Sequence, residues 1–222
     1  MKKTKKQKSK KLVSTHIAVV LDKSGSMSTC LNDTIGGFNQ FLKTQKELKG
    51  KATITLAQFN DNYELISDMK SLDESEELTI NNYIPSGFTA LLDAIGKTIN
   101  DVEAKIKDMP KKSRPEKVIF VIITDGEENR SREFKKDQIM QMINSHRDEK
   151  KWEFVFIGAN QDAIQSGDQI GIVAGSSLNY TQDPQGTRTM YSCLTSSMSA
   201  YRSRDVNDKS DFFEPQKDTP KK

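Results

Sequence analysis

Three apolar runs stand out along this chain and predict buried strands. They are Ile17–Leu21, Val118–Ile123 and Trp152–Gly158, and only the third contains a charged residue, Glu153. Short apolar runs with polar residues at both ends are typical of strands that are covered on both faces, as in a parallel sheet. We therefore expect these three segments to form the centre of such a sheet.

Helices are predicted where apolar residues recur at steps of three and four positions. Such stripes cover about residues 31–48, 90–106 and 186–204, and a shorter one precedes the third apolar run. Gly36 and Gly37 fall inside the first of these helices and weaken it. Gly37 is a candidate for close packing of this helix against the sheet.

A two-residue alternation at 51–59 predicts a strand with one more polar face. Turn residues at Asn60–Asn62 and an extended segment at 63–69 indicate a hairpin, and hence one antiparallel strand at the sheet edge. Ile172–Leu178 is the last strand candidate. The order of elements predicts an α/β fold, with an open, mostly parallel, doubly wound sheet, one antiparallel edge strand and helices on both faces.

Length and composition indicate one domain with polar ends. The chain has 222 residues, of which 34% are hydrophobic and 29% charged, and this is enough for one sizeable core. We expect a disordered Lys-rich arm at 1–12, a single domain at 13–204 and a flexible, charged tail at 205–222.

The Lys-rich arm accounts for the positive net charge. Without its seven lysines the formal charge falls from +3 to −4, so the remaining chain is mildly acidic. No aromatic residues lie between the lysines, as base stacking would require, and we therefore expect a solubilising arm and no nucleic-acid partner. Weak contact with an anionic surface, or a targeting role, is the alternative. The lysines are Lys2, Lys3, Lys5, Lys6, Lys8, Lys10 and Lys11.

The sequence shows no pattern of export, membrane insertion or disulfide bonding. The apolar run after the basic start is too short for a secretory signal, and no stretch reaches the length of a membrane span. Cys30 and Cys193 are the only cysteines and form no CxxC motif, so we expect two reduced thiols, with a single long-range disulfide as the alternative. We predict a cytoplasmic chain that is monomeric when free.

A polar hexapeptide, Asp22–Met27, follows the first apolar run directly. Its Asp22, Ser24 and Ser26 occupy alternate positions and bring three oxygen atoms to one tight loop. Carboxylate and hydroxyl oxygens are hard ligands that suit Mg²⁺. Taken alone, the pattern is more typical of a Ser/Gly turn in which the aspartate hydrogen-bonds locally.

Two later segments favour the metal site. Thr89 lies just before the second predicted helix, and Asp125 follows the second apolar run. Loops at the carboxyl ends of neighbouring parallel strands converge on one crevice, so we expect both residues to lie near Asp22. Asp162, after the third run, is a candidate helix N-cap, with a place on the rim of the site as the alternative.

In these three segments the chain resembles the von Willebrand factor type A domain, and the resemblance covers about residues 13–180. The segments are similar to that family's metal-ion-dependent adhesion site. The resemblance implies that hydroxyl groups bind the ion and that two carboxylates act directly or through water. The implied hydroxyl ligands are Ser24, Ser26 and Thr89, and the implied carboxylates are Asp22 and Asp125.

The resemblance also implies a cofactor and a partner. The ion would be Mg²⁺, with Mn²⁺ as the alternative, and in this family a carboxylate from a partner protein often completes its coordination sphere. We therefore expect an unknown protein partner that offers an Asp or Glu side chain. Together with the missing export signal, the resemblance points to the intracellular type of bacteria or bacteriophages.

These inferences predict a non-enzymatic, divalent-metal-dependent protein-binding module. Two carboxylates balance the charge of Mg²⁺ and the hydroxyls add none, so the ion can accept a further anionic oxygen. Lys23 is either a solvated loop residue or a residue that attracts the partner carboxylate. Glu127 and Glu128 would oppose an acidic partner if they faced the ion.

Two other functions compete with this prediction. A metal-assisted hydrolase of phosphate esters would use Asp22, but Ser24 stands where haloacid-dehalogenase-type enzymes carry the acid/base Asp. A scaffold whose Lys-rich arm contacts nucleic acid is the second alternative. The sequence lacks the G-x-x-x-x-G-K-[ST], G-x-G-x-x-G and G-x-S-x-G motifs, and His16 and His146 are its only histidines.

Overall fold

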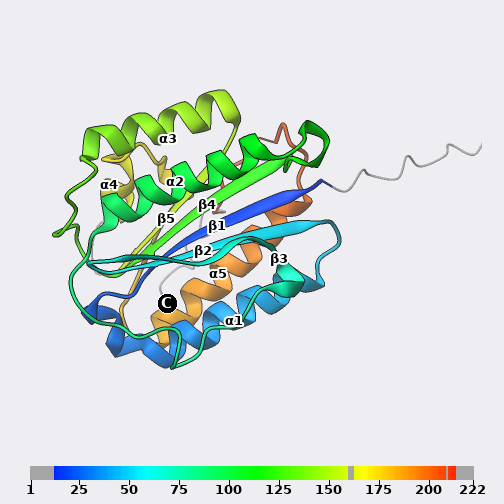
Figure 1. The fold of residues 1–222 in the computed structure, drawn as a ribbon. Helices are drawn as coiled ribbons and strands as arrows, with labels where there is room; N and C mark the ends of the chain where they lie inside the picture. The colour runs from blue at the N-terminus through cyan, green and yellow to red at the C-terminus, as the bar shows by residue number, and fades with distance from the viewer. Residues whose placement is uncertain (1–12, 160–162, 209, 214–222) are drawn as a thin grey trace, which may run out of the picture.

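The computed structural model describes residues 13–159, 163–208 and 210–213. Its centre is a six-stranded sheet in the order β3-β2-β1-β4-β5-β6 (Figure 1). All neighbouring strands are parallel except β2 and β3, whose antiparallel pairing places β3 at one edge. The strands are β1 (Thr15–Asp22), β2 (Ala52–Phe59), β3 (Tyr63–Ser71), β4 (Lys117–Thr124), β5 (Glu153–Ala159) and β6 (Ser177–Tyr180).

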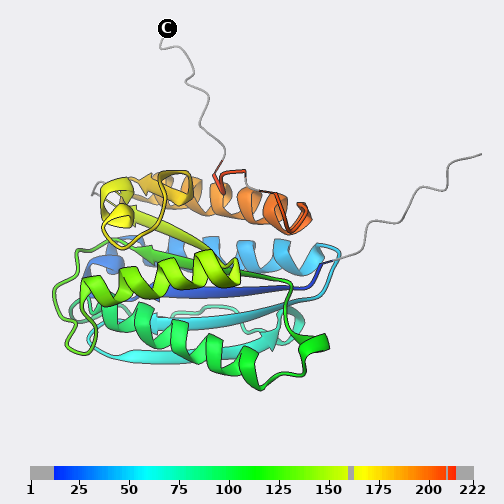
Figure 2. The same cartoon turned by 90° about the horizontal axis from the view of Figure 1, so that it is seen from above.

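Helices cover both faces of this sheet (Figure 2), with α1 and α5 on one face and α2, α3 and the short α4 on the other. Side chains along β1 point alternately to the two faces of the sheet. Val19 packs towards α1 and α5, and Val20 packs towards α2. The predicted doubly wound α/β fold is therefore confirmed. The helices are α1 (Leu31–Glu47), α2 (Leu91–Asp108), α3 (Lys136–Lys150), α4 (Ala163–Asp168) and α5 (Pro184–Ser203).

β1 is the central element of the core. It pairs with β2 on one side and β4 on the other, and all eight of its residues are buried. Its carboxyl end is therefore held in place from both sides, which matters because the candidate site begins there. None of the helices in the described ranges combines the length and apolar character that a membrane crossing requires.

The last strand lies further along the chain than the sequence predicted. The predicted strand was Ile172–Leu178, whereas β6 is Ser177–Tyr180. Ile172 is buried, but its amide donates to the Gly167 carbonyl (2.9 Å) at the end of α4. The prediction was wrong here because an apolar residue that closes a helix is buried as deeply as one in a strand.

The final helix begins at Pro184, two residues before the predicted start. Pro184 occupies the first turn, where a missing amide proton removes no helical hydrogen bond. Asp183 caps this end, since its carboxylate accepts a hydrogen bond from the Gly186 amide at 2.6 Å. The Asp-Pro pair therefore sets the start of α5 and fixes the loop before it.

The packed domain extends beyond its predicted end at residue 204. Phe212 and Phe213 are 1% and 7% exposed and belong to the core under α1 and α5. The Phe213 amide donates to the Gly175 carbonyl (2.9 Å), and the Phe212 ring centre lies 5.7 Å from that of Tyr201. A flexible tail from residue 205 is therefore wrong for this segment, because two aromatic side chains anchor it. The arm at 1–12, Asp162 and residues 214–222 lie outside the described residues.

The two glycines inside α1 have different surroundings. A β-carbon at Gly37 would lie 2.6 Å from Cγ and 2.9 Å from Cβ of Tyr191 on α5, whereas one at Gly36 would meet nothing within 4 Å. Gly37 therefore allows close packing, as predicted, but against α5 and not against the sheet. Gly36 only lowers the helix propensity of α1.

Gly37→Ala and Gly36→Ala form a matched pair that tests this packing. We expect Gly37→Ala to lower the free energy of unfolding by about 1–3 kcal/mol, because the Tyr191 ring must move. Gly36→Ala should leave it unchanged or raise it by up to about 1 kcal/mol through helix propensity. Urea denaturation of both variants would measure this, and equal effects would contradict the close α1–α5 contact.

Candidate metal centre

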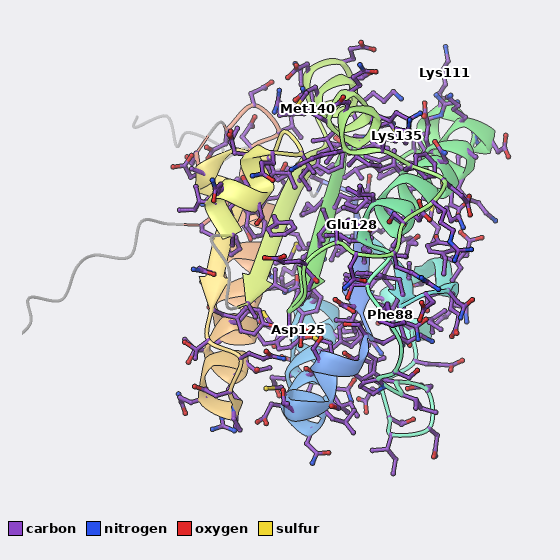
Figure 3. The ribbon with its side chains drawn as sticks, turned by 90° about the vertical axis from the view of Figure 1, so that its left-hand side faces the viewer. Phe88, Lys111, Asp125, Glu128, Lys135 and Met140 are labelled. Atoms are coloured by element: carbon purple, nitrogen blue, oxygen red, sulfur yellow. The ribbon has the colours of Figure 1, made fainter. Side chains whose placement is uncertain are left out.

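The residues of the predicted metal site lie at the carboxyl ends of β1 and β4, which are neighbours in the sheet. The helix that follows β1 covers one face, and the helix that follows β4 covers the other. This is the topological switch point, where an open α/β sheet leaves a crevice for a ligand. Figure 3 shows the molecule from this end, with Asp125 labelled.

Hydrogen bonds join the loop that follows β1, which we call the first loop, to Asp125, the residue after β4. The Asp22 carboxylate accepts from the Ser24 amide (2.6 Å), and the Ser24 and Ser26 hydroxyl oxygens are 3.1 Å apart. The Ser26 hydroxyl donates to Oδ1 of Asp125 at 2.6 Å. Four of the five predicted site residues therefore form one continuous chain of contacts.

Thr89 lies at the same place. A β-carbon built on Gly126, the residue after Asp125, would lie 3.0 Å from the Thr89 hydroxyl and 3.8 Å from that of Ser26. The structure thus brings all five predicted residues together from three loops. It also gives Gly126 a role, because a side chain there would crowd two of the hydroxyl groups.

The loop before α2 is tied to the first loop by three hydrogen bonds. The Tyr83 hydroxyl donates to the Asp22 carbonyl (2.6 Å), and the Ser86 amide donates to the Lys23 carbonyl (2.9 Å). The Gly25 amide donates in turn to the carbonyl of Gly87 at 3.1 Å. These three contacts position the segment that leads to Thr89, and none of them involves the Thr89 side chain.

The loop after β4 is tied to Thr89 and to the start of α2. Asn129 pairs with Thr89 twice, since each backbone amide donates to an oxygen of the other residue (3.0 and 3.1 Å). Glu128 accepts from the Leu92 amide (2.9 Å) and from the Ser131 hydroxyl (2.7 Å). The Glu128 carboxylate is thus engaged by α2 and the loop, where it satisfies a free amide of the first helical turn.

Lys23 does not behave as the sequence predicted. Its Nζ forms an ion pair with Glu64 on β3 at 2.7 Å, and its side chain is only 10% exposed. The prediction of a solvated loop lysine is therefore wrong, because the side chain reaches from the loop after β1 to the edge strand β3. Its charge is matched by Glu64 and not free to attract a partner.

Gln182 is a residue of this site that the sequence reasoning missed. It lies in the loop before α5, and its amide donates to the Ser26 carbonyl (2.9 Å), to the Thr29 hydroxyl (3.2 Å) and to Oδ2 of Asp125. Asp125 is thus held on both carboxylate oxygens, by Ser26 and by Gln182. No local motif marks a lone glutamine 57 residues after Asp125, so only the fold reveals it.

Both histidines lie away from these residues. His16 is at the opposite end of β1 from Asp22, about 20 Å away at the usual rise of a strand, and burial lowers its pKa to about 3. His146 is in α3, where its Nδ1 contacts the Met142 carbonyl and its Nε2 lies 3.2 Å from Glu103. Neither could serve as the base of a Ser-His-Asp triad here.

Burial makes the two carboxylates costly to ionise. Asp22 is 0% exposed, and burial raises its pKa to about 6 although the Thr124 hydroxyl donates to its Oδ2 at 2.6 Å. Burial likewise raises the pKa of Asp125. Two buried negative charges that a hydroxyl chain links are an arrangement that a cation would stabilise.

The oxygen atoms present fit a hard divalent cation. Two carboxylates and three hydroxyls offer oxygen ligands with a charge that balances a doubly positive ion. Across the described ranges, no three or more His, Cys, Asp and Glu side chains cluster in a way that could hold a metal. Any metal at this site would therefore depend on hydroxyl groups as well as carboxylates.

The pKa of Asp22 predicts the pH dependence of the metal-free protein. Its folded-state pKa of about 6 exceeds the ordinary value of 3.8, so between these pH values the folded state binds more protons than the unfolded state. The contribution of Asp22 to stability should therefore fall by up to about 3 kcal/mol as pH rises from about 4 to above 6. Urea denaturation in EDTA should show this fall in wild type relative to Asp22→Asn, and parallel pH profiles would contradict it.

Comparison with known proteins identifies the fold family. The model of the von Willebrand factor type A domain matches residues 16–189. No curated protein matches the chain. Among solved structures, the von Willebrand factor type A protein from Catenulispora acidiphila aligns with a TM-score of 0.57 at 12% identity, over 84% of this chain and 43% of that one.

A mussel protein gives two further similar structures. Proximal thread matrix protein 1 from the mussel byssus aligns with a TM-score of 0.56 at 14% identity, over 84% of this chain and 46% of that one. Its form with a zinc-occupied MIDAS motif aligns at 0.54 and 15%, over 85% and 46%. The chain thus spans less than half the length of these relatives, and at such identities the likeness concerns the fold. Since the family model covers most of the chain and the fold agrees with it, this chain belongs to the von Willebrand factor type A domain family.

Proposed function

We propose that this chain is a divalent-metal-dependent protein-binding module. One observation carries the proposal: Asp22 and Asp125, both with raised pKa values, are joined through the hydroxyls of Ser24 and Ser26 at the open end of the sheet. Thr89 adds a third hydroxyl at the same point. This arrangement supports binding of Mg²⁺, with Mn²⁺ as the alternative.

Each residue of the site has a distinct part in this proposal. The hydroxyl oxygens of Ser24, Ser26 and Thr89 would bind the ion. The Asp125 carboxylate already accepts a hydrogen bond from the Ser26 hydroxyl, so it can orient that hydroxyl towards the ion. The bound ion would supply the positive charge that attracts an Asp or Glu carboxylate of a partner protein.

The same contacts favour binding over hydrolysis. Both oxygens of the Asp22 carboxylate accept hydrogen bonds, one from the Ser24 amide and one from the Thr124 hydroxyl. A carboxylate held in this way is poorly placed to attack a phosphate ester. With both histidines placed elsewhere in the fold, a non-enzymatic module is the function that the site supports best.

Metal should stabilise the folded chain, and the effect should depend on the site residues. At about 100 times its dissociation constant, Mg²⁺ should add about 2.7 kcal/mol, which raises the melting temperature by about 5–11 °C for a chain of this size. Asp22→Ala, Thr89→Ala and Asp125→Ala should each remove this increment. Differential scanning calorimetry with Mg²⁺ and with EDTA measures it.

Two surface variants are the controls for this experiment. Asp148→Ala and Thr189→Ala remove a carboxylate and a hydroxyl group from exposed positions on α3 and α5, and both should keep the full increment. Identical melting curves of wild type with metal and with chelator would contradict the proposal. Zinc should be compared with magnesium, because the mussel relative holds zinc in its motif.

Gln182→Ala tests the support of Asp125 from the α5 side. Since the Gln182 amide holds Oδ2 of Asp125, its loss should weaken Mg²⁺ binding by about tenfold, within the range typical of residues that orient metal ligands. Gln185→Ala, three residues on in α5, is the matched control and should leave the affinity unchanged. Isothermal titration with Mg²⁺ gives both values, and equal affinities of the two variants would show that Gln182 has no such part.

A further inference from the structure

A basic linker lies at the end of the sheet opposite the metal centre. It covers residues 109–116, between α2 and β4, and contains the short helical turn Lys111–Ser113. Figures 1 and 2 both show this linker at the same end of the molecule as the start of β1. From Thr15 to Asp22, β1 spans about 23 Å at the usual rise of a strand. The linker is therefore well separated from the metal centre.

Hydrogen bonds join the start of β1 to this linker. The Ser14 carbonyl accepts from the amides of Glu116 (2.9 Å) and Lys117 (3.1 Å), and the Ser14 hydroxyl accepts from the Glu116 amide at 3.2 Å. On the other side of β1, the Thr15 amide donates to the Lys51 carbonyl (3.0 Å). The Lys-rich arm, residues 1–12, precedes this anchored segment in the sequence. The point at which the arm joins the domain therefore adjoins the linker.

Two exposed lysines of the linker have no charged partner. Lys111 and Lys112 form no ion pair with any residue in the ranges 13–159, 163–208 and 210–213. Other cations close by in the sequence are engaged. Lys107 pairs with Glu103 at 2.7 Å, and the Arg114 guanidinium donates to two backbone carbonyls at the end of α2 (3.1 and 2.8 Å). Lys111 and Lys112 are therefore available to an external anion.

The backbone that carries these two lysines is fixed. Pro110 and Pro115 restrict the chain on either side of them. The Ser113 amide donates to the Pro110 carbonyl (2.8 Å), and the side chain of Arg114 ties the turn to the end of α2. Charges on an ordered backbone lose less conformational freedom when a ligand binds to them.

The two ends of the sheet differ in their available charge. The arm contains seven lysines and no acidic residue, and Lys111 and Lys112 add two more cations next to its attachment point. The linker and the residue before it carry two carboxylates, Asp108 and Glu116. The carboxylates of the metal centre are too distant to oppose an anion here, because exposed charges are largely screened beyond about 8 Å at physiological salt.

Double-stranded nucleic acid fits this arrangement better than a single strand or a membrane. Proteins that bind single strands stack the bases on aromatic side chains, and neither the arm nor the linker contains one. Stable membrane attachment needs an apolar group besides a basic segment, and residues 2–11 include no apolar residue. A duplex presents one phosphate charge per about 1.7 Å of its axis, which cations alone can contact.

We propose that the Lys-rich arm and the linker lysines Lys111 and Lys112 together bind the phosphate backbone of double-stranded nucleic acid. The prediction of a solubilising arm was based on its missing aromatic residues, which contact with duplex phosphates does not require. Binding at this end would not need the metal. The chain would then have two separate binding ends, one for a metal-dependent protein partner and one for a polyanion.

Adjacent lysine pairs allow a matched test in the full chain. Three double variants remove the same charge from the arm, from the linker and from exposed positions at the start of α3, which lies at the metal end. Fluorescence polarisation of a labelled DNA duplex, measured over a range of salt concentrations, gives the affinity and its salt dependence. The variants are Lys10→Gln/Lys11→Gln, Lys111→Gln/Lys112→Gln and Lys135→Gln/Lys136→Gln.

The arm and linker variants should each weaken duplex binding by at least about tenfold at about 0.15 M salt. The slope of log K against log salt concentration should become less negative by about 2, one for each lost phosphate contact. The α3 variant should change neither quantity. Binding by the wild type should be the same in EDTA, and Asp22→Ala should keep it. Equal melting temperatures of the three variants in EDTA would show that the fold is intact.

Four outcomes would contradict this inference. They are no duplex binding by the wild type, equal affinities of the linker and α3 variants, loss of binding in EDTA, and binding to vesicles of equal parts phosphatidylserine and phosphatidylcholine that is as tight as binding to the duplex. The last would assign the basic end to a membrane surface. None of them bears on the metal-dependent function, because the increment in melting temperature with Mg²⁺ is measured separately.

Discussion

The structure depends on one electrostatic constraint, the burial of two carboxylates at the end of its central strands. Asp22 is completely buried and Asp125 nearly so, and the pKa values of both are raised by burial. Nearby hydroxyls and amides offset part of this cost, but they carry no positive charge. A divalent cation would supply the missing positive charge, and this is the basis of the proposed function.

The fold stabilises this arrangement through contacts between loops. The first loop is bonded to the loop before α2, which is paired with the loop after β4 through Thr89 and Asn129. Gln182 joins the loop before α5 to the same point. The loops after β1, β4 and β6 leave the carboxyl end of these parallel strands, so the strand order brings them within reach of one another. The loop before α2 leaves the antiparallel strand β3 at the opposite end and comes back to the site at Ser86 and Gly87.

Sequence patterns predicted the centre of this molecule better than its periphery. β1 and β4 were predicted because their apolar runs are unbroken. Asp22 and Asp125 stand at the ends of these two strands and Thr89 just before α2, so the positions of these elements indicated the three residues. Gln182 and the position of Glu128 were not evident, because both depend on contacts across the fold. The anchoring of Phe212 and Phe213 was missed for a related reason: most residues on either side of this pair are charged or polar, so the local composition resembles a tail.

Crystals grown with Mn²⁺ would test the central claim most directly, because anomalous scattering locates that ion without reference to the protein atoms. The account predicts one peak within about 2.6 Å of the hydroxyl oxygens of Ser24, Ser26 and Thr89, the range of oxygen ligands around hard divalent cations, with Asp22 and Asp125 in contact directly or through water. The absence of a peak there at saturating Mn²⁺, or a peak that leaves out the Thr89 hydroxyl, would contradict it.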